Sequence, residues 1–150
     1  MKTYLVTGAA GFIGSNFVKY LLKKYGEDIQ IIIVDALTYA GNLASIKDEI
    51  ELDNVSFVKS DIADYETIKS VFTNNDIDYV VNFAAESHVD RSITNPKLFL
   101  ETNIIGTQNM LQCAREAWYV GKDEMGSPIY KDGVKYLQIP AAENCEIIHA

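Results

Sequence analysis

Hydrophobic residues along this chain occur in short continuous runs that alternate with longer stretches of helical spacing. Because the run from Ile31 to Val34 shows no polar alternation, we expect strands that helices cover on both faces. The runs predict strands at about 3–7, 29–35, 55–60, 78–84 and 135–139. The stretches between them predict helices at about 12–25, 43–51, 65–74 and 96–119.

The order of these elements predicts the fold class. Strands that alternate with helices form right-handed crossovers and a parallel sheet. We therefore predict an α/β protein with a Rossmann-like, doubly wound parallel sheet of strand order 3-2-1-4-5. Its ligand crevice should lie between the first and fourth strands, where the order reverses. A length of 150 residues suits one domain, 1–150, with a turn-rich loop at 120–133.

Three glycines follow the first predicted strand at a spacing of three residues. Gly8, Gly11 and Gly14 stand between that strand and the first predicted helix. This arrangement predicts a phosphate cradle. Gly8 permits a tight turn, Gly11 presents no Cβ to a pyrophosphate, and Gly14 lets the helix pack closely on the strand. The N–H groups and the positive dipole end of the helix then face the anion.

An acidic residue, Asp35, ends the second strand. It follows the glycines by about 20 residues, where a dinucleotide fold places the carboxylate that accepts from the adenosine ribose. Such a carboxylate accepts from a free ribose diol and repels a 2′-phosphate, so the sequence predicts NAD rather than NADP. The alternative is a strand-end aspartate that caps a turn.

Asp61 and Ile62 close the third strand. In this fold that position meets the adenine, so Asp61 could accept from the exocyclic amine while Ile62 packs on the ring. The alternative is an ordinary turn at a strand end.

The fourth strand leads into a polar loop. The small Ala84 and Ala85 allow a nucleotide to approach, and Ser87, His88 and Asp90 follow closely. These three residues suit phosphate and hydroxyl recognition better than a hydrolase triad, because near neighbours on one loop cannot readily form the serine-to-histidine-to-aspartate chain.

Several small or polar residues interrupt the last predicted helix. Because interior glycine and threonine lower helix propensity, we expect them either to pack closely on the sheet or to contact a cofactor. They are Thr102, Asn103, Gly106 and Thr107.

Composition excludes several function classes. A net charge of −8 argues against an extended nucleic-acid surface. Cys113 and Cys145 form neither a disulfide framework nor a metal-binding spacing, which favours a reducing, cytoplasmic compartment and no metal. The apolar stretch after Lys2 is explained by the glycine spacing rather than by a secretion signal. Since no apolar run reaches membrane-spanning length, we expect no membrane partner.

Four strings of the sequence together resemble the extended short-chain dehydrogenase/reductases, and within them the dTDP-glucose 4,6-dehydratase family. The resemblance covers about residues 1–139. The strings are Thr7 to Gly14, Asp35 to Leu43, Ala84 to Ser92, and Glu101 to Asn103 with Gly106 and Thr107.

This resemblance implies a site and a reaction. Ser87 would lie beside the nucleotide sugar, dTDP-glucose, with His88 and Arg91 near it. In the family NAD takes a hydride from C4 of the hexose, water leaves across C5 and C6, and the hydride returns at C6. The implied NAD site comprises Phe12, Ile13, Asp35, Ala36, Leu37, Thr38, Asp61, Ile62, Phe83, Ala84, Ala85 and Thr102.

The chain departs from the family after the fifth predicted strand. There the family carries Ser-Thr-Asp-Glu-Val-Tyr-Gly, whereas this chain has Pro140, Ala141, Ala142 and Glu143, of which only Glu143 coincides. The Tyr-x-x-x-Lys pair expected on the next helix does not follow. We therefore expect an atypical tail at 140–150, no substrate domain, and a catalytically incomplete chain.

Self-association should be affected as well. The family dimerises through the helix after the fourth strand and the helix after the fifth, and only the first is present. The resemblance thus implies a homodimer that is weakened or lost here.

Two other functions fit the same residues. One is a different nucleotide-sugar epimerase or dehydratase. The other is a non-catalytic module that senses NAD or mediates an interaction, since such proteins keep the cradle and lose the catalytic pair.

Overall fold

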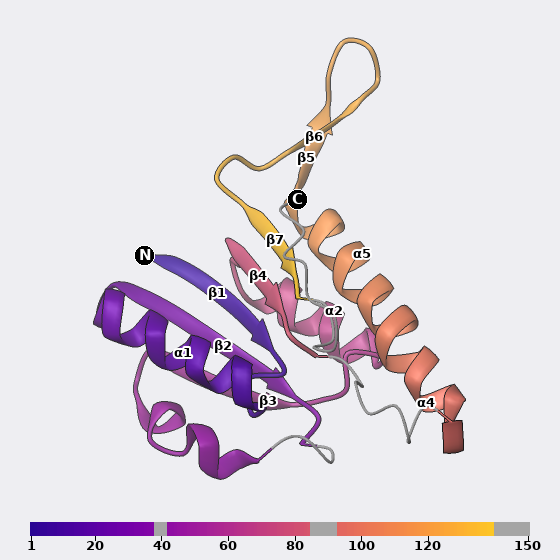
Figure 1. Ribbon diagram of the computed structural model, residues 1–150. Coiled ribbons are helices and arrows are strands. Elements are labelled where there is room, and N and C mark those ends of the chain that lie inside the picture. The colour runs from indigo at the N-terminus through magenta and orange to yellow at the C-terminus, as the bar shows by residue number, and fades with distance from the viewer. Residues whose placement is uncertain (38–41, 85–92, 140–150) are drawn as a thin grey trace.

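The computed structural model describes residues 1–37, 42–84 and 93–139. These residues form a five-stranded sheet between helices, and a separate two-stranded hairpin (Figure 1). The strands of the sheet are β1 (Lys2–Thr7), β2 (Ile29–Asp35), β3 (Val55–Lys59), β4 (Tyr79–Asn82) and β7 (Lys135–Gln138), and the hairpin consists of β5 (Tyr119–Lys122) and β6 (Pro128–Tyr130). The helices are α1 (Phe12–Tyr25), α2 (Tyr65–Asn74), α4 (Pro96–Leu100) and α5 (Thr107–Trp118), and a π-helical segment (Glu101–Gly106) joins the last two.

The sheet confirms the predicted topology. Its strands follow the order β3-β2-β1-β4-β7, and every neighbouring pair is parallel. Since β7 is the fifth predicted strand, this is the order 3-2-1-4-5. Thr7 of β1 lies opposite Val34 of β2 and Asn82 of β4. The carboxyl ends of the three central strands therefore meet at one edge of the sheet, where a doubly wound fold binds its ligands.

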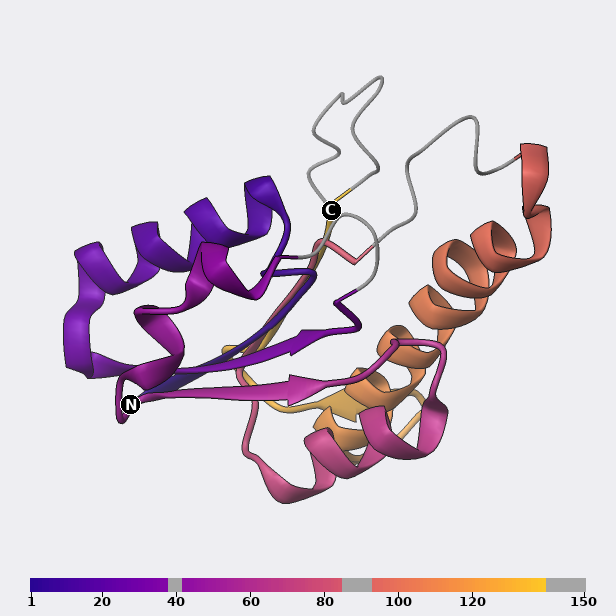
Figure 2. The same ribbon diagram turned by 90° about the horizontal axis from the view of Figure 1, so that it is seen from below.

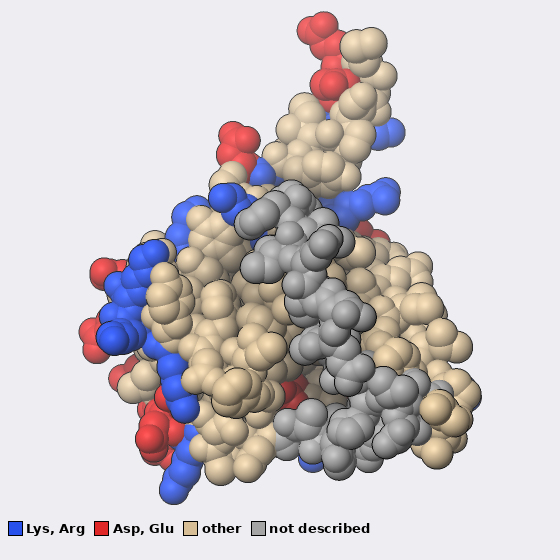
Figure 3. All heavy atoms as spheres, in the orientation of Figure 1, with Lys and Arg blue, Asp and Glu red and all other residues tan. Residues whose placement is uncertain are grey.

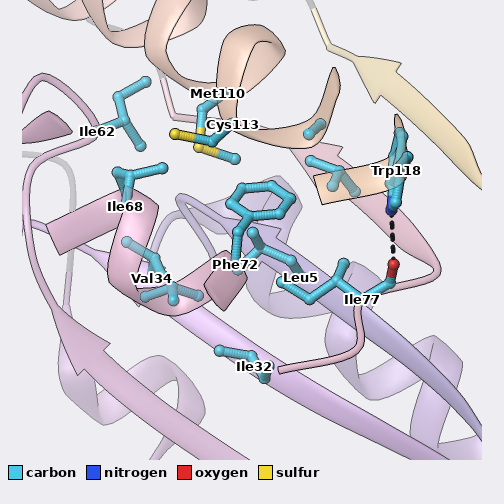
Figure 4. Close-up of a cluster of buried hydrophobic side chains, with 13 residues drawn as sticks. Leu5, Ile32, Val34, Ile62, Ile68, Phe72, Ile77, Met110, Cys113 and Trp118 are labelled. Atoms are coloured by element: carbon cyan, nitrogen blue, oxygen red, sulfur yellow. Dashed lines mark hydrogen bonds between the residues drawn. The ribbon is translucent and has the colours of Figure 1, made fainter. Parts of the chain in front are cut away.

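Helices cover the two faces of the sheet, and each face has its own core. In Figure 2, α1 lies on one side of the strands and α2 and α5 lie on the other. Successive residues of β1 point to opposite faces, so Leu5 joins the cluster under α2 and α5 while Val6 joins the cluster under α1. The indole Nε1 of Trp118 donates to the carbonyl of Ile77 at 2.7 Å and anchors the end of α5 (Figure 4).

Helix starts follow their local chemistry. The Asp64 carboxylate accepts from the N–H of Thr67 at 3.3 Å, and the Asn95 side chain accepts from the N–H of Leu98 at 3.3 Å. Pro96 occupies the first position of α4, where it leaves no donor unpaired.

Two predicted helices differ from the structure. The stretch 43–51 is not one helix but two short 3₁₀ helices, Leu43–Ile46 and Glu49–Glu51. Of these seven residues only Ile46 is buried, so little apolar surface holds a longer helix. The predicted helix 96–119 ends at Trp118 and contains the π-helical segment.

The loop predicted at 120–133 contains most of the β5–β6 hairpin, which the sequence did not predict. In Figure 1 the hairpin projects from the body of the molecule. Its strands bury no residue, so they carry no apolar alternation that could have indicated them.

Basic side chains gather on one exposed surface. Lys19, Lys23 and Lys24 are all exposed on α1, and Figure 3 shows blue side chains over this helix. This cluster is the solvated face of an amphipathic helix.

Candidate functional site

The glycine-rich turn lies directly against the end of β4. Gly8 has a φ of +68°, a left-handed conformation that favours glycine, and its N–H donates to the carbonyl of Val34 at 2.9 Å. A Cβ on Gly8 would lie 2.7 Å from the backbone nitrogen of Ala84. The absence of a side chain therefore sets both the turn and its distance from β4.

The second and third glycines have different roles. A Cβ on Gly14 would overlap the carbonyl oxygen of Gly8 and lie 2.8 Å from Cα of Ala9. Gly14 thus lets α1 pack on the turn, rather than on the strand as expected, because the turn folds back over the helix start. A Cβ on Gly11 would meet the carbonyl oxygen of Gly8 at 3.3 Å and no second atom of the described chain within 4 Å. Among the described residues, nothing but this oxygen stands where a Cβ of Gly11 would be.

The start of α1 offers backbone donors to that space. Its N-cap is Gly11, which has no side chain to occupy the first N–H groups, and the first turn carries no acid. Lys23 and Lys24 stand in the last turn, where they complement the helix dipole. Beside the glycines, Phe12 is 84% and Ile13 50% exposed.

Asp35 links the end of β2 to the glycine-rich turn. Its side chain is buried, and one carboxylate oxygen accepts from the N–H of Ala10 at 2.9 Å. The other accepts from the N–H of Leu37 at 2.7 Å. Leu37 has a φ of +54°, which is uncommon for a residue with a side chain and is supported here by that hydrogen bond. Asp35 is thus a turn cap, and each of its oxygens keeps a further lone pair.

The Asp61–Ile62 turn follows β3. The Asp61 carboxylate accepts from the N–H of Ala63 at 2.9 Å, and the N–H of Asp64 donates to the carbonyl of Asp61 at 3.0 Å. The side chain of Ile62 is only 2% exposed and belongs to the core cluster with Met110 (Figure 4).

A buried polar network joins three strand ends at the same edge of the sheet. The Thr7 hydroxyl pairs with the side-chain oxygen of Asn82, and the Asn82 amide donates to Gln138 at 2.8 Å and to the Tyr136 hydroxyl at 3.4 Å. Burial raises the pKa of Tyr136 to about 12, so its hydroxyl stays protonated and donates to Gln138. The Thr7 hydroxyl also accepts from the N–H of Ala84 at 3.3 Å.

This network was missed by sequence reasoning, although a signal was present. Thr7 and Asn82 are polar residues at the ends of otherwise apolar strands, and both are fully buried. A buried polar side chain needs a partner, so two such residues at neighbouring strand ends predict a contact. Next to them, the ring of Phe83 packs on the ring of Phe17 in α1, with centroids 5.3 Å apart.

The long helix contributes to the site through its π-helical segment. Thr102 lies within this segment and is half-buried. At its end Gly106 is buried against Ile62, and one turn further the Asn109 amide donates to the carbonyl of Ile62 at 3.0 Å. Gly106 therefore packs closely, but on the turn after β3 rather than on the sheet as expected.

Several predicted site residues meet at the carboxyl edge of the sheet. Gly8 contacts the backbone of Phe83 and Ala84, and Asp35 contacts the turn that carries Gly8 and Gly11. Ala36 and Leu37 follow directly at the end of β2, and both are half-buried. The remaining predicted residues lie outside the described residues: Thr38, Ala85, Ser87, His88, Arg91 and Glu143.

The described residues offer neither a metal site nor a membrane span. In ranges 1–37, 42–84 and 93–139, no cluster of three or more histidine, cysteine or acidic side chains could hold a metal ion. Nor does any helix in these ranges have the length and apolar character needed to cross a membrane.

The fold and the glycine-rich turn place the chain among the Rossmann-like α/β proteins. Residues 5–143 match the model of the GDP-mannose 4,6 dehydratase family, so the chain belongs to that family. A probable dTDP-glucose 4,6-dehydratase from Sinorhizobium fredii is 51% identical over 114 residues, which are 76% of this chain and 32% of that protein. The chain thus spans about a third of the length of this relative.

Solved structures of nucleotide-sugar enzymes are similar to this chain as well. A dTDP-glucose 4,6-dehydratase from Bacillus anthracis in complex with NAD matches with a TM-score of 0.71 and 38% identity, over 92% of this chain and 37% of that one. A UDP-Glc/GlcNAc 4-epimerase from Campylobacter jejuni matches with a TM-score of 0.69 and 28% identity, over 78% and 34% of the two chains. The chain is more similar in sequence to this dehydratase than to this epimerase.

Proposed function

We propose that the chain is the NAD-binding part of a nucleotide-sugar dehydratase of the dTDP-glucose 4,6-dehydratase type. The observation that carries the proposal is the space beside Gly11, which a Cβ would enter and which borders the uncapped start of α1. Backbone N–H groups at a helix start suit a pyrophosphate. The B. anthracis relative with the same fold is in complex with NAD.

The adenosine half of NAD would lie between the ends of β1, β2 and β3. The carboxylate of Asp35 would accept from the ribose hydroxyls, since each oxygen binds one backbone N–H and keeps a lone pair. A 2′-phosphate would meet this negative charge, so NAD should be preferred to NADP. Asp61 and Ile62 would receive the adenine, but Ile62 through its backbone rather than by the expected packing on the ring, because its side chain is buried in the core. The exposed Phe12 and Ile13 would flank the pyrophosphate.

The nicotinamide half would lie toward β4 and the long helix. Phe83 and Ala84 stand beside the glycine-rich turn, and we propose that Ala85 and Thr102 complete this side. When bound, NAD supplies the hydride acceptor and donor of the reaction. We propose Ser87, His88 and Arg91 as contacts to a nucleotide sugar, by the resemblance of their string to the dehydratases.

We further propose that the 150-residue chain does not complete dehydration. Where the family carries threonine and aspartate, this chain has Ala141 and Ala142, which can neither donate nor accept a proton. Glu143 alone stands at the position of a family acid. The chain would then bind NAD without turning over dTDP-glucose.

The test is a calorimetric titration of the purified chain with NAD⁺ and, in parallel, with NADP⁺. We expect a single site that prefers NAD⁺, and no 4-keto-6-deoxy sugar after incubation with dTDP-glucose and NAD⁺. Binding of neither dinucleotide would refute the proposed cofactor site. Tighter binding of NADP⁺ would refute the role of Asp35, and product formation would refute the proposed catalytic defect.

Two alternatives remain testable in the same preparation. Turnover of a UDP-sugar without dehydration would favour an epimerase, which the C. jejuni match supports at 28% identity. A partner interaction that depends on NAD⁺ would favour a sensing module. The higher identity to dehydratases favours the first proposal.

Self-association through the long helix is a separate proposal. The apolar side chains Leu100, Ile104, Ile105 and Leu111 are 45–58% exposed along α4, the π-helical segment and α5. A second copy of the chain is the partner that the homodimeric family implies. Light scattering should detect either a weak, concentration-dependent dimer that Ile104→Lys abolishes or a monomer, and a tight, monodisperse dimer would contradict the proposal that self-association is weakened or lost.

We also propose a cytoplasmic location. Cys113 is a buried free thiol, which suits a reducing compartment. Fractionation of expressing cells should recover the chain with cytoplasmic markers, and recovery from an oxidising compartment would contradict the proposal.

A further inference from the structure

Gly106 and Asn109 of the long helix both contact Ile62 in the Asp61–Ile62 turn. The side chain of Asn109 is buried, and its Nδ2 donates to the carbonyl of Ile62 at 3.0 Å. A Cβ on Gly106 would overlap Ile62, and it would lie 2.7 Å from Cδ1 of that residue. The helix therefore touches the turn through a hydrogen bond and through a close contact in which a Cβ on Gly106 would displace the Ile62 side chain.

The turn is also held on the side of β2, where the N–H of Ser60 donates to the carbonyl of Asp35 at 3.1 Å. Its local hydrogen bonds, from Ala63 to the Asp61 carboxylate and from Asp64 to the Asp61 carbonyl, define its shape. They do not fix its distance from the sheet, because both partners belong to the turn. On the side of the long helix, the turn is held by the contact of Ile62 with Gly106 and by the hydrogen bond from Asn109.

The π-helical segment runs up to the first of these two residues. Glu101–Gly106 ends at Gly106, three positions before Asn109, so the two residues share one helix face. π-Helical segments occur frequently at functional sites.

We propose that Gly106 and Asn109 are positioning residues that hold the Asp61–Ile62 turn where it receives the adenine of NAD. This inference rests on the proposed function. Neither residue contacts the cofactor. They act through Ile62, whose buried side chain and carbonyl connect the helix to the turn.

α5 provides a matched control. At its other end the indole of Trp118 donates to the carbonyl of Ile77 at 2.7 Å, as Asn109 does to Ile62. Both bonds tie a buried side chain of one helix to a loop that flanks α2. Trp118→Phe removes a donor of the same kind, but far along the helix from the turn.

The experiment compares Asn109→Ala, Gly106→Ala and Trp118→Phe in titrations with NAD⁺, AMP and inorganic pyrophosphate. Loss of one buried hydrogen bond in Asn109→Ala should weaken the binding of NAD⁺ and of AMP by roughly tenfold. The affinity for pyrophosphate should stay unchanged. Gly106→Ala should show the same pattern. Trp118→Phe should lower the thermal midpoint and leave all three affinities unchanged. Because Asn109→Ala creates no overlap, it tests the inference even if Gly106→Ala does not fold.

Amide hydrogen exchange without ligand gives an independent measurement. The N–H groups of Ala63 and Asp64 should exchange faster in Asn109→Ala and at the wild-type rate in Trp118→Phe. Unchanged AMP affinity in Asn109→Ala, or an equal loss for pyrophosphate, would overturn the inference while leaving NAD binding intact. A wild-type chain that binds neither NAD⁺ nor AMP would overturn the proposed function, and the inference with it.

Discussion

The carboxylate of Asp35 accepts a hydrogen bond from the backbone N–H of Ala10 at 2.9 Å and so joins the end of β2 to the glycine-rich turn. The residue proposed to bind the ribose therefore also shapes the turn proposed to bind the phosphates. Asp35→Ala removes the acceptor of two buried N–H groups, and each uncompensated group costs about 1–3 kcal/mol. We expect NAD⁺ to bind about 5- to 150-fold more weakly in a calorimetric titration.

A control separates charge from position. Asp53 is exposed in a different loop, and Asp53→Ala changes the net charge by the same amount. Its affinity for NAD⁺ should equal that of the wild type. Equal losses in both variants would mean that Asp35 acts only through the overall charge.

Substitutions of Gly11 and Gly14 should have different effects, one on cofactor binding and the other on stability. A Cβ on Gly14 meets backbone atoms of Gly8 and Ala9, which cannot move aside cheaply, whereas a Cβ on Gly11 meets one oxygen at 3.3 Å. Gly14→Ala should lower the free energy of unfolding by about 1–3 kcal/mol in urea titrations. Gly11→Ala should unfold nearly as the wild type does but bind NAD⁺ at least tenfold more weakly. A greater loss of stability in Gly11→Ala, with a greater loss of NAD⁺ affinity in Gly14→Ala, would contradict the proposed phosphate-binding turn.

Sequence patterns predicted the sheet well because its central strands β1, β2 and β4 are largely buried. Val6 and Ile33 belong to continuous apolar runs, and Gly8 and Asp35 stand where those runs end. These runs located the strands, and their alternation with helices led to the observed strand order and to the glycine-rich turn at the end of β1. The hairpin was missed for the opposite reason, since residues such as Val120 are exposed and show no period.

The fine geometry of the site depended on contacts between distant parts of the chain. No local pattern reveals that Gly106 packs on Ile62, or that Asp35 bonds to Ala10, because each pair belongs to two different elements. The π-helical segment was not predictable either. A single inserted residue changes the helical spacing too little to be seen among the mixed polar and apolar residues after Pro96.

Acid should weaken the link between β1 and β4. Burial alone would raise the pKa of Asp78, but the N–H of Thr3 at 2.9 Å and the ammonium groups of Lys2 and Lys131, each at 3.5 Å, lower it below its usual value. A depressed folded-state pKa stabilises the fold above the unfolded value, about 3.9, and this stability is lost as the pH falls through the folded value.

The measurement compares the wild type with Asp78→Asn in urea titrations at pH 6 and pH 3. At pH 6 the variant should be less stable by about 1–3 kcal/mol, and at pH 3 the difference should shrink. Asp53→Asn, which changes an exposed side chain, serves as the control. A difference that is constant with pH would show that the Asp78 carboxylate is not held in its charged form.

Alkali should act on the buried thiol of Cys113. Burial raises the pKa of this group to about 11, so only about one thiol in a thousand is ionised at pH 8. Because the thiolate is the reactive form and the side chain is 2% exposed, the native chain should resist a disulfide reagent at pH 8. A Cys145→Ser background leaves Cys113 as the single thiol.

The raised pKa of Cys113 also makes the stability of the fold depend on pH. A folded-state pKa above the unfolded value, about 8.5, stabilises the fold fully below that pH, and this contribution is lost as the pH rises toward 11. In the Cys145→Ser background, the free energy of unfolding should fall more between pH 9 and 11 than it does after the further change Cys113→Ala. Rapid modification of the native thiol at pH 8, complete before urea is added, would show that the core under α2 and α5 opens far more readily than its packing indicates.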